Sequence, residues 1–188
     1  MACIAFSGGV ALGWLYDADL WALRTAQEHH LGFLDIMLGL FPLLGGLEVS
    51  GVILLVLLAG LSLRGRRALA GRILAVFVAT GLLELAMKMF LPQVPIQKET
   101  ALAEDYAPLV AMELPYPYPS GHVLRSAIIF GTLCLLSGNW LLRAGSLAVL
   151  VGIATSRVYF GVHWASDVVG GALLGAAGLL WAFSGKRV

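Results

Sequence analysis

The sequence has little charge and almost no cysteine. Only 12% of its 188 residues are charged, whereas 60% are hydrophobic. A soluble domain carries about 25% charged residues, so the composition excludes an ordinary soluble fold and indicates a polytopic membrane protein. A net charge of +1 gives no basis for binding nucleic acid. Cys3 and Cys134 lie far apart in apolar segments, which argues against a disulfide framework or a zinc site.

Long apolar runs are what the chain does have. Five of them approach the 17 to 25 residues that a membrane helix needs, and they cover residues 47–63, 70–91, 122–137, 141–159 and 165–183. A sixth, shorter run covers 2–16, and no basic region precedes it as in a cleaved signal, so we expect it to be retained. We therefore predict an all-α fold, a polytopic membrane helix bundle of about six transmembrane helices, forming one domain over residues 1–188.

We expect an N-terminal part, residues 1–46, to precede the helix bundle at 47–188. Residues 17–46 connect the first apolar run to this bundle. This segment carries Asp19, Arg24 and Glu28 in its first half, and its apolar second half ends in Gly45-Gly46. A mixed polar and apolar pattern favours a helix lying in the membrane interface. A short membrane hairpin remains the alternative.

Basic residues collect in three places, which predicts the orientation. They are Arg64, Arg66, Arg67 and Arg72 in one connection, Arg143 in another, and Lys186 with Arg187 at the C-terminus. Short loops rich in Lys and Arg stay in the cytoplasm. The connections at 93–119 and 160–164 are then expected on the opposite, periplasmic or extracellular, side of the inner (plasma) membrane.

His163 and Asp167 stand at the start of the last apolar run. Ionisable residues beside membrane spans are expensive and usually functional. Because the two residues are four apart, they share one face of a helix, and the carboxylate can bond one ring nitrogen while the other attacks an electrophile. The alternative is a pair that only anchors the start of the helix.

Three further positions suit an anion. Arg157 lies six residues before His163, and its planar guanidinium can hold two phosphoryl oxygens, although an arginine at the end of a span often only reaches for headgroups. Ser120 and Gly121, in the run Pro-Ser-Gly-His, offer a hydroxyl and backbone N–H groups at a helix start. An ordinary Ser N-cap has the same pattern.

Both stretches, 119–122 and 156–167, resemble motifs of the type 2 phosphatidic acid phosphatase family, and the resemblance extends from about residue 47 onward. It implies a metal-independent phosphatase without a cofactor that works through a phosphohistidine. By this resemblance His163 is the nucleophile, Asp167 supports it, and His122 is the general acid. Lys88, Ser120, Gly121 and Arg157 would bind the substrate phosphate.

A third family motif is incomplete. It normally reads Lys, six residues, Arg, Pro; Lys88 matches, but Pro95 occupies the position of the arginine. Arg125 lies three residues after His122, on nearly the same helical face, and we propose that it supplies the missing charge, with Gln93 and Lys98 as weaker candidates. The alternative is that Arg125 pairs with Glu84, which could instead pair with Lys88.

The resemblance thus predicts an integral membrane lipid phosphatase acting at the outer leaflet. The substrate classes it allows are a polyprenyl diphosphate such as undecaprenyl diphosphate, phosphatidylglycerol phosphate and phosphatidic acid. We expect the lipid substrate and membrane lipids as the binding partners, without a protein partner or nucleic acid. Two alternatives remain: a lipid phosphotransferase using the same phosphohistidine, and a non-catalytic lipid-phosphate binder.

Overall fold

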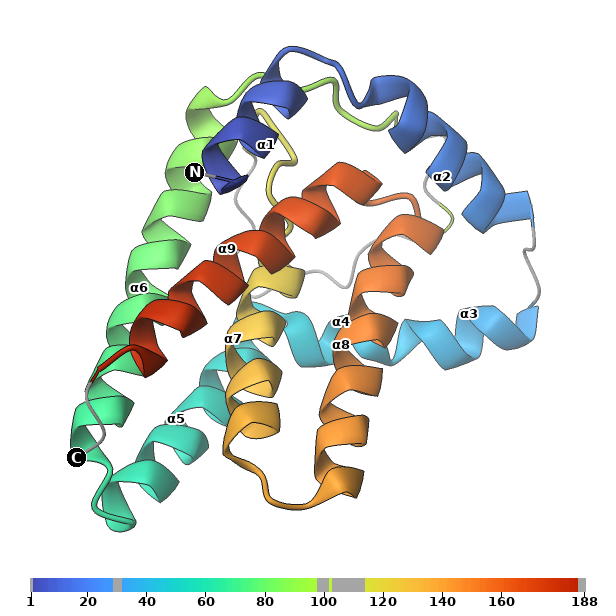
Figure 1. The fold of residues 1–188 in the computed structure, drawn as a ribbon. Coiled ribbons are helices and arrows are strands. Elements are labelled where there is room, and N and C mark those ends of the chain that lie inside the picture. The colour runs from blue at the N-terminus through green and yellow to red at the C-terminus, as the bar shows by residue number, and fades with distance from the viewer. Residues whose placement is uncertain (1, 29–31, 98–101, 103–113, 186–188) are drawn as a thin grey trace.

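The computed structural model describes residues 2–28, 32–97, 102 and 114–185. Within these residues the chain forms helices and no strand, which confirms the all-α class. The helices are α1 (Ala2–Ala11), α2 (Tyr16–Glu28), α3 (Gly32–Gly39), α4 (Phe41–Gly45), α5 (Leu47–Leu63), α6 (Arg67–Phe90), α7 (Gly121–Leu136), α8 (Trp140–Tyr159) and α9 (Ala165–Phe183) (Figure 1).

Helix α7 is the centre of the bundle. It packs against α8 and α9 most extensively, and also against α5 and α6. Its residues Leu124, Ile128 and Ile129 are fully buried and form the core with Ile73 of α6 and Leu179 of α9. The apolar composition of α7 therefore serves contacts between helices, and its start is held on several sides.

The helices around α7 have the properties of membrane spans. Helices α6, α8 and α9 are long and apolar enough to cross a bilayer, and the pair 32–45 and 47–63, bent by 59°, passes the same test as a broken span or a re-entrant loop. The predicted count of six spans is not confirmed. Helix α1 has 10 residues, which at 1.5 Å per residue reach about 15 Å, half of the hydrocarbon thickness.

The segment expected to hold an interfacial helix forms three helices, α2, α3 and α4, and the interfacial position stays a prediction. Pro42 lies in the first turn of α4, and Gly46 follows its end with φ −59° and ψ 152°. A Cβ at Gly45 would come within 3.0 Å of His122. The glycine therefore lets α4 lie directly against the start of α7, and the apolar second half of the segment joins the bent pair.

The motif-bearing helix ends gather at one end of the bundle. Helices α6 and α8 end there and α7 and α9 begin there, whereas the α5–α6 and α7–α8 turns lie at the other end (Figure 1). Arg64 belongs to the α5–α6 turn, and Arg143 lies in the first turn of α8, where its Nε donates to the carbonyl oxygen of Ser137. These two basic regions therefore lie at the end opposite the motifs, whereas Lys186 and Arg187 lie outside the described residues.

Two glycines of α9 allow it to approach α7 closely. A Cβ at Gly171 would lie 2.5 Å from the carbonyl oxygen of Ser120, and one at Gly175 would lie 2.7 Å from the Cβ of Ala127. Small residues permit such backbone contact between membrane helices.

We expect Gly171→Ala to push α9 away from Ser120 and to lower the free energy of unfolding by about 1–3 kcal/mol, as overpacking does. Gly81→Ala on α6 is the matched control, because a Cβ there meets nothing within 4 Å. Thermal unfolding of both variants in detergent measures the difference. Equal stability of the two variants would contradict the close packing.

Candidate active site

The turn between α8 and α9 fixes His163 relative to Arg157. The carbonyl oxygen of Arg157 accepts hydrogen bonds from the backbone N–H groups of Val162 and His163, both at 3.2 Å. Gly161 has φ 70°, a left-handed conformation that favours glycine. Arg157 is 2% exposed, so the turn holds a buried cation close to the imidazole.

His163 and Asp167 form the predicted pair. The His163 Nδ1 and Asp167 Oδ2 atoms lie 3.0 Å apart, and the same carboxylate oxygen accepts a hydrogen bond from the Trp164 N–H at 3.0 Å. Asp167 is fully buried. The carboxylate therefore both orients the imidazole and caps the first turn of α9. The contacts fit a pair that prepares a nucleophile and also a pair that anchors the start of the helix.

A backbone hydrogen bond joins the two stretches, 119–122 and 156–167, that match the family motifs. The Ser120 N–H donates to the carbonyl oxygen of Asp167 at 3.0 Å. This N–H is therefore occupied, and of the two amides predicted to meet phosphate only that of Gly121 remains a candidate. The Ser120 side chain is fully buried, and its Oγ has no hydrogen-bond partner in the part of the chain that the structure describes.

His122 lies at the first turn of α7, where the predicted cations converge. Electrostatic interactions link its ring to Arg157, Arg125, His163 and Lys88. These residues come from three helices, α6, α7 and α8, and from the α8–α9 turn. The structure thus brings the eight predicted site residues to one end of the bundle.

Glu84 holds two of these cations. Its carboxylate lies 3.4 Å from Lys88 Nζ and 3.2 Å from Arg125 Nη1, and Arg125 Nε also donates to the Gly45 carbonyl at 3.3 Å. The alternative pairing of Arg125 with Glu84 is confirmed, and Glu84 pairs with Lys88 as well. Any Cβ at Gly121 would overlap with the Glu84 carboxylate, so this glycine is needed where α6 meets α7.

The motif that begins at Lys88 has Pro95 in place of its arginine and so adds no second cation to the site. Pro95 is exposed, and Lys98 lies outside the described residues. Gln93 does reach this end of the bundle: its Nε2 donates to Ser166 Oγ at 3.3 Å, and its side chain also interacts with Asp167. Gln93 therefore supports the start of α9.

A third buried carboxylate beside Asp167 and Glu84, that of Asp19 on α2, was not predicted from the sequence. It accepts hydrogen bonds from the Ser166 N–H at 2.7 Å and from the Ser166 hydroxyl at 2.6 Å. Burial raises the pKa of the Asp19 carboxyl above its ordinary value, and the two bonds from Ser166 oppose this. No local pattern marks Asp19, because its partner lies 147 residues away.

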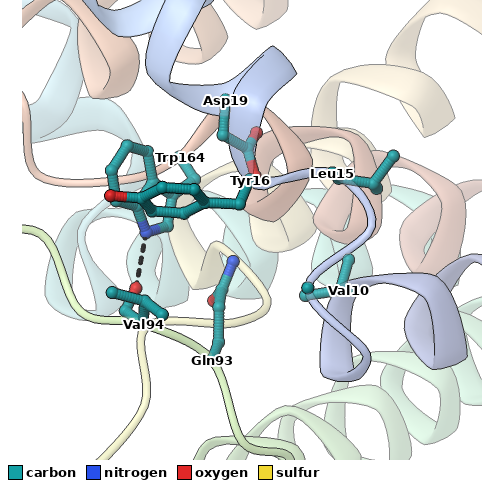
Figure 2. A pocket seen from close by; sticks show the side chains of 8 residues that line it. Val10, Leu15, Tyr16, Asp19, Gln93, Val94 and Trp164 are labelled. Atoms are coloured by element: carbon teal, nitrogen blue, oxygen red, sulfur yellow. Dashed lines mark hydrogen bonds between the residues drawn. The ribbon is translucent and has the colours of Figure 1, made fainter.

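A small cavity of about 30 Å³ lies beside Asp19, lined by Val10, Gly13, Leu15, Tyr16, Asp19, Gln93, Val94 and Trp164. Figure 2 shows Gln93 reaching toward α2 and Trp164 bonded to the Val94 carbonyl, at 2.7 Å. This volume admits water but no lipid headgroup. The described residues also contain no group of three or more His, Cys, Asp or Glu side chains that could hold a metal ion.

The model of the PAP2 superfamily matches residues 67–187, which include every predicted site residue. The chain belongs to this superfamily. Helices α1 to α5 precede the matched region, so the superfamily model leaves out the segment that carries Asp19.

Two curated proteins resemble this PAP2 superfamily member in sequence. It is 44% identical over 61 residues to an undecaprenyl-diphosphatase of Sulfolobus acidocaldarius, over 32% of this chain and 29% of that protein. It is 40% identical over 82 residues to phosphatidylglycerophosphatase B of Bacillus subtilis, over 38% of this chain and 39% of that protein. The matched stretches therefore span well under half of both relatives.

Two solved structures share the fold. The PAP2-type phosphatidylglycerolphosphate phosphatase of Bacillus subtilis aligns with a TM-score of 0.74 at 22% identity, over 98% of this chain and 94% of that one. LpxE of Aquifex aeolicus aligns with a TM-score of 0.66 at 24% identity, over 88% and 94%. Together with the apolar helices, these likenesses make the chain an integral membrane protein with the PAP2 fold.

Proposed function

We propose that this protein is a lipid phosphatase that hydrolyses a terminal phosphate through a phosphohistidine on His163. The hydrogen bond from the Ser120 N–H to the Asp167 carbonyl carries the proposal. It ties the stretch that bears His122 to the turn that bears His163, so that two imidazoles and several cations meet at one place.

In the first step the Nε2 atom of His163 attacks phosphorus. The Asp167 carboxylate accepts a hydrogen bond from Nδ1 of His163 and so keeps the proton of the neutral ring on Nδ1. The lone pair of the ring then lies on Nε2. The bond from phosphorus to the leaving oxygen breaks, and its electron pair goes to that oxygen. His122 donates a proton to the leaving oxygen as general acid.

Arg157, Lys88, the Ser120 hydroxyl and the Gly121 N–H are the groups proposed to bind the phosphoryl oxygens. The buried hydroxyl of Ser120 has no partner among the described residues, which supports a ligand there, because buried polar groups are normally satisfied. Buried cations stabilise the charge that spreads over these oxygens in the transition state. Arg125 remains a proposed contributor, and to bind phosphate it would share its guanidinium with Glu84.

In the second step water attacks the phosphorus of phosphohistidine. The bond from phosphorus to Nε2 breaks, its electron pair returns to the imidazole, and inorganic phosphate leaves. His122, which lost its proton in the first step, accepts one from the attacking water. The cycle restores both imidazoles and uses only residues of this chain.

The names of the relatives support a polyprenyl diphosphate of the undecaprenyl type or phosphatidylglycerol phosphate as the substrate, with phosphatidic acid as a third candidate. All three carry phosphate at headgroup depth on an apolar tail. The basic turns lie opposite the site (Figure 1), so the positive-inside rule supports a site on the periplasmic or extracellular side of the plasma membrane.

The test is a panel of the three lipids, assayed with purified protein in the presence of a chelator. We expect inorganic phosphate to be released from at least one lipid at an unchanged rate, because no step of this mechanism uses a metal. Labelled phosphate appearing on an added lipid acceptor would identify a phosphotransferase instead. Saturable binding without turnover would identify a lipid-phosphate binder and contradict the proposal.

A further inference from the structure

Helix α9 begins at an N-cap residue whose own side chain does not cap it. Its N-cap residue is Trp164, whose side chain makes no cap hydrogen bond to the helix, and an indole can only donate. The carboxylate of Asp167 satisfies the N–H of Trp164. A second backbone donor of the first turn that has no partner within the helix, the N–H of Ser166, donates to Asp19 of α2.

Asp19 therefore acts as a cap supplied by another helix. A capping carboxylate bonds the orphan N–H groups of a first turn and also suits the positive end of the helix dipole. Both oxygens of Asp19 are used, one on the N–H and one on the hydroxyl of Ser166. Asp19 and Ser166 are 5% and 4% exposed, so water cannot easily take over either bond.

The N-terminal segment also holds the other side of the α8–α9 turn. The Tyr159 hydroxyl donates to Asp35 of α3 at 2.8 Å, and the ring of Tyr16 packs edge-on against Trp164 with centroids 5.8 Å apart. Figure 2 shows the ring of Tyr16 beside that of Trp164, with Asp19 above them. His163 thus lies on a turn whose two ends are both fastened to helices outside the region matched by the superfamily model.

Ser166 links Asp19 to the catalytic pair. Its hydroxyl donates to Asp19 at 2.6 Å and accepts from the Gln93 amide at 3.3 Å, while Gln93 also interacts with Asp167. A hydroxyl has one proton, so Ser166 can accept from Gln93 in this way because its own proton goes to the carboxylate. Removing the charge of Asp19 would disturb the bonds on both sides of Ser166.

We propose that Asp19 is a positioning residue, which fixes the first turn of α9 and thereby the His163–Asp167 pair for attack on phosphorus. This inference rests on the proposed phosphatase function. Asp19 itself touches neither substrate nor phosphorus. Its effect is on the alignment of the nucleophile, and small misplacements of reacting groups are expensive in rate.

The experiment compares Asp19→Asn with Asp17→Asn, an exposed aspartate two residues earlier on the same helix. We expect Asp19→Asn to lower kcat about 10- to 100-fold with KM unchanged, because phosphate binding does not depend on Asp19, and Asp17→Asn to behave as the wild type. Hydrogen exchange of the peptide covering 160–167 should become faster only in Asp19→Asn. Ser166→Ala should lower kcat similarly, and the double variant no further, since the two residues act as a unit.

The inference would be overturned if Asp19→Asn had the same kcat and the same hydrogen exchange as Asp17→Asn. It would also be overturned if the losses of Asp19→Asn and Ser166→Ala multiplied in the double variant. A fall in the kcat of Asp19→Asn that only followed a lower thermal midpoint of the whole protein would overturn it as well. These outcomes differ from a failure of the proposed phosphatase function. If that function is wrong, the wild type releases no phosphate from any lipid, but faster hydrogen exchange at 160–167 in Asp19→Asn still supports the role of Asp19 in holding the turn.

Discussion

Replacing His163 with alanine is expected to reduce kcat by at least about ten-thousand-fold, because the variant has no nucleophile to form the covalent intermediate. The wild type, quenched during turnover of a substrate labelled in its terminal phosphate, should carry an acid-labile label on the protein. His163→Ala should carry none. The label and the initial rate of phosphate release are the two measurements.

His122→Ala is the matched comparison, since His122 is the other imidazole of the site. With a lipid substrate, whose alkoxide or phosphate leaving group needs a proton, we expect a loss of roughly a hundred- to ten-thousand-fold. With an aryl phosphate, whose leaving group departs without a proton, formation of the phosphohistidine should lose little of its rate in His122→Ala, and the initial burst of released phenol measures this step. Attack of water on the phosphohistidine, in which His122 is the base, should stay slow with both substrates. His163→Ala should give no burst. A burst that is slowed in His122→Ala as much as lipid turnover would contradict the role of His122 as general acid.

The bundle could largely be predicted from the sequence because apolar runs end where the backbone must turn. The bounds of α5 and α9 match the predicted runs 47–63 and 165–183, and α7 and α8 differ by one residue at their ends. Helix α6 begins at Arg67, before its apolar run, because the preceding turn is set by Gly65 with φ 76°. Polarity therefore located the spans well, while local backbone geometry decided one of their ends.

The N-terminal third could not be predicted in the same way. Its apolar residues suit an interfacial helix, a hairpin or a broken span equally, since periodicity does not distinguish among them. Helices α1, α2, α3 and α4 of this segment have 10, 13, 8 and 5 residues, and each is too short to span a membrane alone. Their positions depend on contacts with the bundle, such as that of Gly45 with His122.

Contacts within the site could be predicted where the two interacting residues lie close together in the sequence. The spacing of His163 and Asp167 predicted their contact. For Glu84 the sequence left two partners open, Lys88 four residues away and Arg125, which is 41 residues away, and the structure shows that Glu84 contacts both. Asp19 gave no signal, because a carboxylate in a polar helix resembles a solvated one until the fold brings Ser166 to it.

Asp167→Asn is expected to lower kcat by about a thousand- to ten-thousand-fold, the scale seen when a catalytic histidine is held in the wrong tautomer. The asparagine oxygen can still accept the N–H of Trp164 and keep the first turn of α9 capped. Its NH₂ group would then face Nδ1 of His163, which draws the ring proton to Nε2 and removes the lone pair that attacks phosphorus. Steady-state kinetics should show the loss in kcat with little change in KM.

Asn therefore separates the two roles of this carboxylate, and Asp167→Ala supplies the comparison. Alanine removes the cap as well, so we expect the thermal midpoint of Asp167→Ala to fall by more than that of Asp167→Asn, in line with about 1 kcal/mol for a lost cap. If Asp167→Asn kept more than about a tenth of the wild-type kcat, a loss of under 1.4 kcal/mol in transition-state stabilisation, capping alone would account for Asp167. The orientation of His163 would then have to come from the turn that the Arg157 carbonyl and Asp19 hold.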